Sequence, residues 1–235
     1  MIDLLNESNL LLGKLDGVAV NLPDRDLFIS MYVEKEATVS SQIEGTQASL
    51  SDVLQKNNTE KRKETEEIVN YVHSLNYGLN LMDSLPISIR YLRELHRELL
   101  KGVRGETKNP GELRRSQNWI GPRGCNLNNA TFIPPSVELM TEALNDLESY
   151  INDDVNVSSL IKIALIHYQF ETIHPFLDGN GRLGRLLIIL LLKYNNFRQR
   201  LAASSVSASF NASTSGDSKL EMANAGPLRP RMVPR

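Results

Sequence analysis

A base, a carboxylate, three glycines, an amide and two arginines lie within the twelve residues from His174 to Arg185, which read HPFLDGNGRLGR. His174 carries the side chain whose ordinary pKa suits proton transfer near neutral pH. Asp178 offers a hard oxygen ligand that suits Mg²⁺ already carried by phosphates. Arg182 and Arg185 are three positions apart, so they can share one face of a helical turn and fork onto phosphate oxygens. The stretch therefore predicts transfer chemistry on a nucleotide, with His174 as the base.

The glycines and the apolar residues that follow them predict how this chemistry is positioned. Glycine lets backbone N–H groups approach phosphate oxygens without a Cβ in the way. The apolar run over residues 186–192 predicts a helix, whose N-terminus adds partial positive charge and free N–H donors. Each residue type also has an ordinary explanation: a core histidine, solvated arginines or turn glycines. Their combination at this spacing favours a functional site.

The twelve residues resemble the signature HxFx(D/E)GNGRxxR of the Fic family, with every defined position present. Members of that family mostly transfer AMP from ATP to a hydroxyl side chain (Tyr, Thr or Ser) of a target protein. The resemblance implies that His174 deprotonates the hydroxyl, that Asp178 holds Mg²⁺, and that self-modification accompanies transfer to the target. The residues that it implies for ATP binding are Gly179, Asn180, Gly181, Arg182, Leu183, Gly184 and Arg185.

A second motif lies upstream, where Ser40-Ser-Gln-Ile-Glu44-Gly45 ends a helix predicted to begin near Arg25 with Asp24 as its N-cap. It resembles the inhibitory motif (S/T)xxxE(G/N) of Fic proteins that carry their own brake. The resemblance implies that Glu44 pairs with Arg185 and that Ser40, one turn earlier, steadies it. Such a pair consumes a phosphate ligand and places negative charge at the phosphate site. The alternative is a surface glutamate beside a helix-ending glycine, and removal of AMP in the same site is also left open.

The spacing of apolar residues predicts an all-α fold around these motifs. A three- and four-residue repeat predicts an amphipathic helix over 68–82, and Ser88 and Ser136 are predicted N-caps of two further helices. The segment 158–171 is apolar on nearly every side, which predicts a central buried helix that ends at His174. The residues expected to face inward include Leu27, Met31 and Ile43 of the inhibitory helix, and Leu139, Met140, Ala143, Leu144, Leu147 and Ile151 after Ser136.

The segment 101–135 is rich in glycine and proline and excludes a long helix. Two short strand candidates within it predict a β-hairpin near residues 117–133. This segment resembles the one that precedes the signature in Fic domains, where the hairpin is a flap that clamps an extended target by main-chain pairing. The alternative is a structural hairpin with Trp119 as a core anchor. The flap residues implied are Asn118, Trp119, Ile120, Gly121, Phe132 and Ile133.

Composition narrows the class of protein. A net charge of −2 gives no electrostatic reason to expect nucleic-acid binding. The single cysteine, Cys125, excludes an internal disulfide, and the N-terminus has no basic region of the kind that begins a secretory signal. The longest apolar run, seven residues over 186–192, is far shorter than the ~20 residues needed to span a bilayer. We therefore expect a cytoplasmic protein without a membrane anchor, and whether it forms a homodimer is left open.

Three regions follow from the motifs: N-terminal helices over 1–60, a Fic catalytic domain over 61–197, and a tail over 198–235 whose Ser- and Ala-rich composition predicts disorder. Because family members usually continue with further helices, the atypical tail leaves open an inactive fragment that acts as a binding module. A related transferase of UMP or phosphate is a second rival, although phosphate-transferring relatives replace the loop glycines that are present here. A hydrolytic metal site at His174 has too few further ligands nearby.

Overall fold

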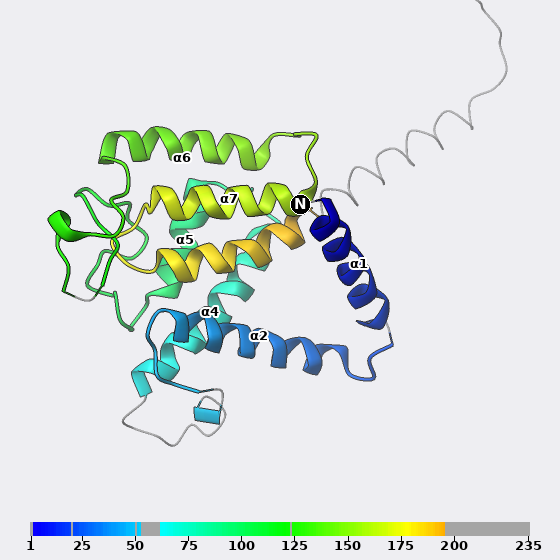
Figure 1. Cartoon of the computed structure of the whole chain (residues 1–235). Coiled ribbons are helices and arrows are strands. Elements are labelled where there is room, and N and C mark those ends of the chain that lie inside the picture. Colours follow the sequence, from blue (N-terminus) through cyan, green and yellow to red (C-terminus); the bar gives the residue numbers. More distant parts are fainter. Residues whose placement is uncertain (1, 20, 50, 53–61, 123, 196–235) are drawn as a thin grey trace, which may run out of the picture. The chain divides into compact units, whose positions relative to one another are not determined.

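The computed structural model describes residues 2–19, 21–49, 51–52, 62–122 and 124–195, which form a mostly helical fold (Figure 1). This confirms the predicted all-α class. The helix over residues 180–195, coloured orange in Figure 1, contains the second half of the signature and is named the signature helix below. The other elements are α1 (Ile2–Ala19), α2 (Arg25–Ile43), α4 (Arg62–Leu81), α5 (Ile89–Leu99), the 3₁₀-helix η1 (Leu127–Asn129), α6 (Val137–Asn152) and α7 (Ser159–Ile173).

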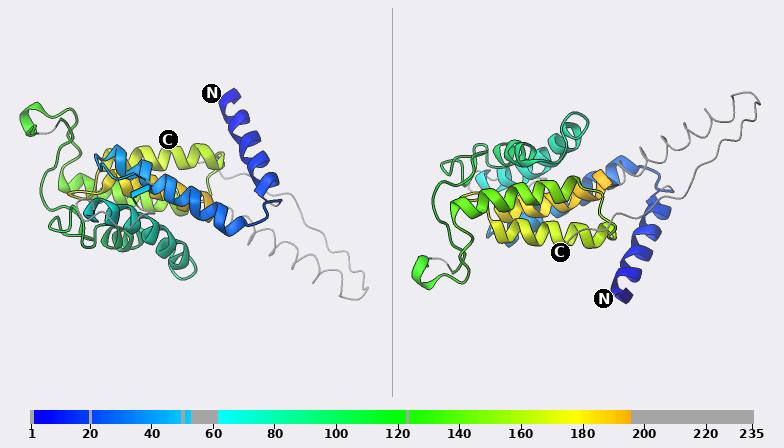
Figure 2. Two further views of the ribbon diagram at one scale, coloured as in Figure 1. Left: turned by 90° about the horizontal axis from the view of Figure 1, so that it is seen from below. Right: turned by 90° about the horizontal axis from the view of Figure 1, so that it is seen from above.

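The signature helix is the central element of the packing. α2 packs on α4, α4 on α5, α5 on α6, and α6 on α7. The signature helix contacts α7 through Gly184, which lies against Glu171, and reaches α4 through Leu190, which lies close to Gly78. It runs beside α7 in the views of Figures 1 and 2. Its fully or almost fully buried side chains are Arg182, Leu183, Leu186, Leu187, Leu190 and Leu191.

The prediction that α7 is the central buried helix is therefore wrong. Ile163, Ile166 and Phe170 of α7 are buried, but Leu165 is 49% exposed and Tyr168 is 69% exposed. Apolar residues on every side of a helix show only that it can be buried on every side. The neighbouring helices decide how many of those sides are covered.

The predicted helix starts are confirmed. Asp24 accepts a hydrogen bond from the Leu27 N–H at 3.0 Å, Ser88 from Tyr91 at 3.3 Å, and Ser136 from Leu139 at 3.4 Å. Each cap satisfies an N–H group that has no partner within the first turn of its helix. The capping residue and the residue whose N–H donates to it are three positions apart, so short-range sequence is sufficient to specify the cap.

Several predicted inward positions are wrong. Leu27, Met31 and Ile43 of α2 are 58%, 57% and 63% exposed, and Leu139 of α6 is 57% exposed. The face of α2 that is buried carries small residues instead: Ala37, Thr38, Ser40 and Ser41. Small side chains let two helices approach closely, so the packed face of α2 is not its most apolar face.

The predicted β-hairpin is reduced to a single antiparallel bridge between Ile120 and Phe132 within the described residues. The Ile120 N–H donates to the Phe132 carbonyl at 2.9 Å, and the N–H groups of Thr131 and Phe132 both donate to the Ile120 carbonyl, at 2.8 and 3.0 Å. Because two consecutive donors share one acceptor, a regular ladder does not continue from this point. Trp119 is 42% exposed, so it is not a core anchor.

The predicted tail over 198–235 lies outside the described residues, as does most of the connection before α4. No helix in the described part of the chain is long and apolar enough to cross a membrane.

Candidate active site

His174 occupies the C-cap of α7, and its left-handed backbone, with φ of 49°, turns the chain out of the helix. Its Nδ1 lies 3.3 Å from the Glu171 carbonyl oxygen, an acceptor, so Nδ1 carries the proton and Nε2 keeps a free lone pair. Burial lowers the pKa of His174, with a smaller contribution of the same sign from the Arg114 charge. The imidazole is therefore neutral at pH 7 and able to accept a proton.

Glu171 places a second ionisable group beside this imidazole. Its Oε2 lies 3.9 Å from His174 Nδ1, while its buried Oε1 makes no hydrogen bond within the described part of the chain. Burial raises the pKa of this carboxyl. A side chain at Gly184 would overlap with the present position of Glu171 Oε1, so the glutamate would have to shift.

Arg114 and Asn118 hold the loop that follows His174. The Arg114 guanidinium is buried and donates to the carbonyls of His174 at 3.1 Å, Ser116 at 3.3 Å and Pro135 at 2.6 Å. Asn118 Nδ2 donates to the carbonyl of His174 at 3.1 Å. The sequence assigned no role to Arg114, because locally it cannot be distinguished from Arg115, which is 90% exposed.

Replacing Arg114 by methionine is expected to lower the free energy of unfolding by about 2–4 kcal/mol, because it leaves several buried carbonyl groups without a donor. Urea denaturation measures this change. Arg115→Met removes the same charge from the neighbouring, exposed position and is the matched control, with an expected change below about 0.5 kcal/mol. Equal effects of the two substitutions would show that the buried hydrogen bonds of Arg114 do not hold this loop.

His96 braces the loop from α5. Its Nδ1 accepts from the Gly111 N–H at 2.7 Å, so Nε2 carries the proton and donates to the Asp178 carbonyl at 2.9 Å. The ring stacks on Phe176 with 3.9 Å between ring centroids. Burial lowers the pKa of His96 to about 4, so the ring stays neutral. The ring is fully buried, and its contact with the loop that follows His174 was not predicted from the sequence.

The signature glycines differ in their roles. Gly179 alone among them has a left-handed backbone, with φ of 77°, and the signature helix begins at the next residue. The Asn180 side chain closes this turn through two hydrogen bonds to Phe176. Its Oδ1 accepts from the Phe176 N–H at 2.9 Å, and its Nδ2 donates to the Phe176 carbonyl at 2.8 Å. The first backbone hydrogen bond of the signature helix runs from the Leu183 N–H to the Gly179 carbonyl at 3.0 Å. The N–H groups before Leu183 therefore have no backbone acceptor within the helix. Such free donors at a helix N-terminus favour an anion.

Leu183 and Gly184, both predicted to contact ATP, face the protein interior. Leu183 is fully buried in the hydrophobic core. Gly184 lies against Glu171 and His167 of α7. Their positions in the signature serve packing of the signature helix.

Arg182 carries a fully buried guanidinium. None of its guanidinium nitrogens has a hydrogen-bond partner among the described residues, although Nη1 lies 3.6 Å from Glu67 and Nη2 lies 3.6 Å from Asp178. Burial lowers its pKa, and the two carboxylates oppose this shift. Its unused donors leave it able to bind an incoming anion.

Arg185 is bound by the upstream motif, as the resemblance implied. Its Nη2 lies 2.6 Å from Glu44 Oε1 and 3.0 Å from the Ser40 carbonyl, and its Nε donates to Ser40 Oγ at 2.8 Å. A side chain at Gly181 would overlap with Glu44 Oε1. The carboxylate therefore lies against both Arg185 and the first turn of the signature helix, where an anion is favoured.

Asp178 fits a metal ion that arrives with a ligand. Its side chain is 34% exposed, and Oδ1 accepts from the Gly179 N–H at 2.6 Å. The described residues contain no group of three or more His, Cys, Asp or Glu side chains that could hold a metal ion by themselves. One accessible carboxylate suits Mg²⁺ whose other ligands are phosphate oxygens and water.

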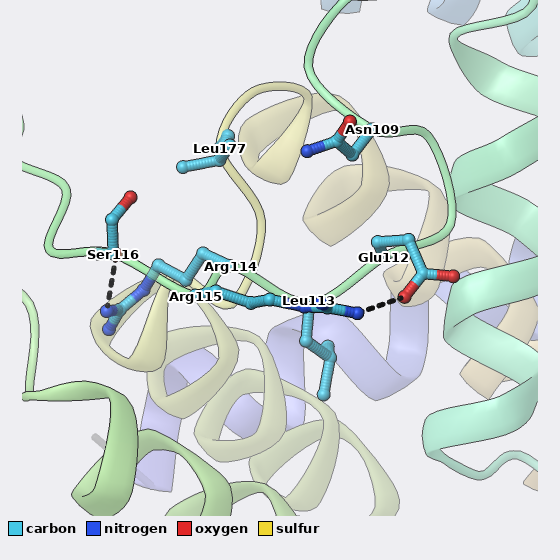
Figure 3. Close-up of a pocket in the computed structure, with 7 residues that line it drawn as sticks. All are labelled: Asn109, Glu112, Leu113, Arg114, Arg115, Ser116 and Leu177. Atoms are coloured by element: carbon cyan, nitrogen blue, oxygen red, sulfur yellow. Dashed lines mark hydrogen bonds and ion pairs between the residues drawn. The ribbon is translucent and has the colours of Figure 1, made fainter.

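Two pockets flank this region. One of about 370 Å³ is bordered by the signature residue Leu177 and by residues 112–116. Figure 3 shows Leu177 on one side of it and Arg115, paired with Glu112, across from it. The other, of about 500 Å³, is lined by Gly45, Thr46 and Glu67 together with the loop over 102–107.

Residues 2–80 match the model of the Fic/DOC family N-terminal region, and residues 86–192 match the Fic/DOC family model. The chain belongs to the Fic/DOC family.

Relatives with this family's name include protein adenylyltransferase fic-1 of Caenorhabditis elegans, 31% identical over 158 residues, which are 66% of this chain and 28% of that protein. Protein adenylyltransferase Fic of Drosophila willistoni is 34% identical over 133 residues, 55% of this chain and 24% of that protein. The chain thus spans about a quarter of the length of these relatives.

Solved structures share the fold. A Fic family protein from Desulfovibrio desulfuricans G20 aligns with a TM-score of 0.65 at 24% identity, over 86% of this chain and 59% of that one. A fragment of Fic-1 from C. elegans aligns with a TM-score of 0.59 at 22% identity, over 88% of this chain and 66% of that one.

Proposed function

We propose that this chain transfers AMP from ATP to a hydroxyl side chain of a target protein and that Glu44 restrains this activity. The observation that carries the proposal is the position of the Glu44 carboxylate, against Arg185 and the first turn of the signature helix. An anion is favoured at this position, and the neutral base His174 and the accessible carboxylate Asp178 belong to the same loop. The names of the relatives support AMP transfer as the reaction.

The residues fit the steps of this transfer. The target hydroxyl oxygen bonds to the α-phosphorus of ATP, the bond from that phosphorus to the bridging oxygen breaks, and pyrophosphate leaves. The proton of the hydroxyl passes to His174 Nε2. Arg182, Arg185 and the helix N-terminus hold the phosphate charge. Mg²⁺, when bound at Asp178, neutralises part of that charge.

The flap residues supply a surface for the target. Trp119, Ile120, Phe132 and Ile133 are between 37% and 50% exposed, so their apolar side chains are accessible. Asn118 fastens the base of this segment to the carbonyls of His174 and Phe176, at 3.1 and 3.0 Å. An extended target segment that pairs with this flap would lie next to the base.

Labelled ATP tests the proposal. The wild-type chain and a Glu44→Gly variant are incubated with a mixture of proteins and with ATP labelled on either the α- or the γ-phosphate. Label from the α-phosphate on protein supports AMP transfer, whereas label from the γ-phosphate indicates a kinase. An absence of protein label from either phosphate with a folded Glu44→Gly variant would contradict the proposal and favour a binding module. UTP labelled on the α-phosphate tests the UMP-transferring rival in the same assay.

Replacing Asp178 by alanine is expected to lower Mg²⁺-dependent transfer at least ~10-fold, with only partial rescue by raised Mg²⁺. The carboxylate is the accessible oxygen ligand next to the anion site, and its loss weakens binding of the metal that accompanies ATP. Rates are measured over a range of Mg²⁺ concentrations in the Glu44→Gly background. Two further variants serve as controls. Asp178→Asn removes the charge but keeps an acceptor for the Gly179 N–H, and Asp146→Ala removes an exposed carboxylate elsewhere in the chain. Transfer that does not depend on Mg²⁺ would exclude this role of Asp178.

A further inference from the structure

Two glutamates of α4 attach the segment that follows the inhibitory motif. Glu64 accepts the Gln47 N–H at 2.9 Å, and Glu67 accepts the Thr46 hydroxyl at 2.6 Å. Glu67 is only 4% exposed and Thr46 is also 4% exposed. A buried hydrogen bond to a carboxylate is among the stronger hydrogen bonds in proteins, because neither partner can exchange it for water. The Thr46–Glu67 bond is therefore a strong attachment two residues beyond Glu44.

The same carboxylate also reaches the signature. Glu67 Oε2 lies 3.6 Å from Arg182 Nη1, and Oε1 lies 3.5 Å from Arg104 Nε. Arg104 in turn lies beside the turn after α2, with its Nη1 4.0 Å from the position of a Cβ at Gly45. One buried carboxylate thus connects the end of the inhibitory motif to a signature arginine.

Arg182 needs this carboxylate because its side chain is only 1% exposed and its guanidinium forms no hydrogen bond with the described residues. A buried cation is costly unless an opposite charge lies nearby. Asp178 supplies a second opposite charge at 3.6 Å, but it is also the residue proposed to bind Mg²⁺. Glu67 has no assigned ligand of its own, so it stays available as a charge partner of Arg182.

The turn from Glu44 to Thr46 is closed by hydrogen bonds, so the positions of these two residues are coupled. Gly45 has a left-handed backbone with φ of 92°, its N–H donates to the Gln42 carbonyl at 2.9 Å, and the Thr46 N–H donates to the Ser41 carbonyl at 3.1 Å. These bonds close the end of α2, so a displacement of Thr46 also displaces Glu44.

We propose that Glu67 is a positioning residue with two connected tasks. It holds the guanidinium of Arg182 in place at the proposed phosphate site, and through Thr46 it holds Glu44 against Arg185. Glu67 thereby acts on both signature arginines, on one directly and on the other through the brake. This inference rests on the proposed function, since the restraining effect of Glu44 is measured as a change in the rate of AMP transfer.

The first arm of the test removes the attachment. Thr46→Val is expected to speed amide hydrogen exchange over residues 41–47 and to raise transfer of α-labelled AMP about five- to tenfold. In the Glu44→Gly background the same substitution is expected to change transfer less than about twofold, because the two changes act on one contact. Thr46→Ser keeps the hydroxyl and is expected to behave as wild type. Thr38→Val is the matched control, since Thr38 is a buried threonine of α2 that bonds only within its own helix, to the Glu34 carbonyl at 2.8 Å.

The second arm tests the positioning of Arg182 in the Glu44→Gly background. Glu67→Gln is expected to weaken MgATP binding and to lower the transfer rate, each about tenfold. Glu64→Gln, one turn earlier on α4, is expected to leave both within about twofold. Calorimetry measures MgATP affinity, and circular dichroism verifies that each variant is folded.

Several results would overturn the inference. Amide exchange in Thr46→Val that equals that of Thr38→Val refutes the attachment. Equal MgATP affinities of Glu67→Gln and Glu64→Gln refute the positioning of Arg182. If Glu44→Gly transfers no AMP, the proposed function fails, while hydrogen exchange and nucleotide binding still decide for or against the two tasks of Glu67.

Discussion

Replacement of His174 by alanine is expected to lower AMP transfer at least ~10²–10⁴-fold while MgATP affinity stays within about twofold. In the proposed function the imidazole accepts the proton of the attacking hydroxyl, whereas the arginines and the helix N-terminus hold the nucleotide. The substitution is made in the Glu44→Gly background so that the parent rate is high enough to measure a loss of this size. Transfer is measured with α-labelled ATP and affinity by calorimetry. A folded His174→Ala variant that still transfers AMP would refute the assignment of the base.

The pH dependence of the transfer rate provides an independent test of His174 as the base. Burial lowers the pKa of His174 below its ordinary value of 6.5, so the proton-accepting form predominates at neutral pH. The rate should therefore be constant on the neutral side and should fall only as the pH drops below 6.5 and the imidazole gains a proton. A rate that already falls to half of its maximum above pH 6.5 would contradict the lowered pKa of His174. The limb is measured as kcat/KM against pH, which reports the free enzyme.

The Glu44→Gly variant is expected to transfer AMP at least about tenfold faster than wild type, including to itself. The Glu44 carboxylate lies 2.6 Å from Arg185, and the two side chains are 33% and 20% exposed, so water screens the pair only in part. Removal of the carboxylate frees Arg185, the proposed phosphate ligand, and takes a negative charge away from the proposed phosphate site. Glu44→Gln removes the charge and keeps the shape, and it is expected to activate as well.

Removal of the other partner should have the opposite effect. Arg185→Ala is expected to lower transfer, because the proposed function also assigns this arginine to ATP binding. The double variant should be no more active than Arg185→Ala alone. The two substitutions are non-additive because they remove one shared contact. All variants are compared in a single labelling assay, with folding verified for each. If Glu44→Gly is no faster than a folded, active wild type, Glu44 is an ordinary residue at a helix end.

Features that depend on neighbours in sequence were predictable. The signature residues, the N-caps at Asp24, Ser88 and Ser136, and the end of α7 at His174 all follow from side chains a few positions apart. A capping hydrogen bond closes over about three residues, so its formation depends little on the rest of the fold. The family resemblance extended this local information to the pairing of Glu44 with Arg185.

Burial and ion pairing between distant segments were decided by the tertiary structure. Ser40 and Arg185 are 145 residues apart, and only the packing of α2 against the signature helix brings them to 2.8 Å. The exposed Leu27 and the buried Arg114 contradict what hydrophobicity alone predicts, because a side chain is buried only where another element covers it. The roles of His96 and Glu67 likewise depend on distant residues that lie against them, on Asp178 for His96 and on Arg182 for Glu67. By itself the sequence determined which groups can do chemistry, while the fold decided which charge each of them faces, because electrostatic and packing energies depend on distance in space and not on separation along the chain.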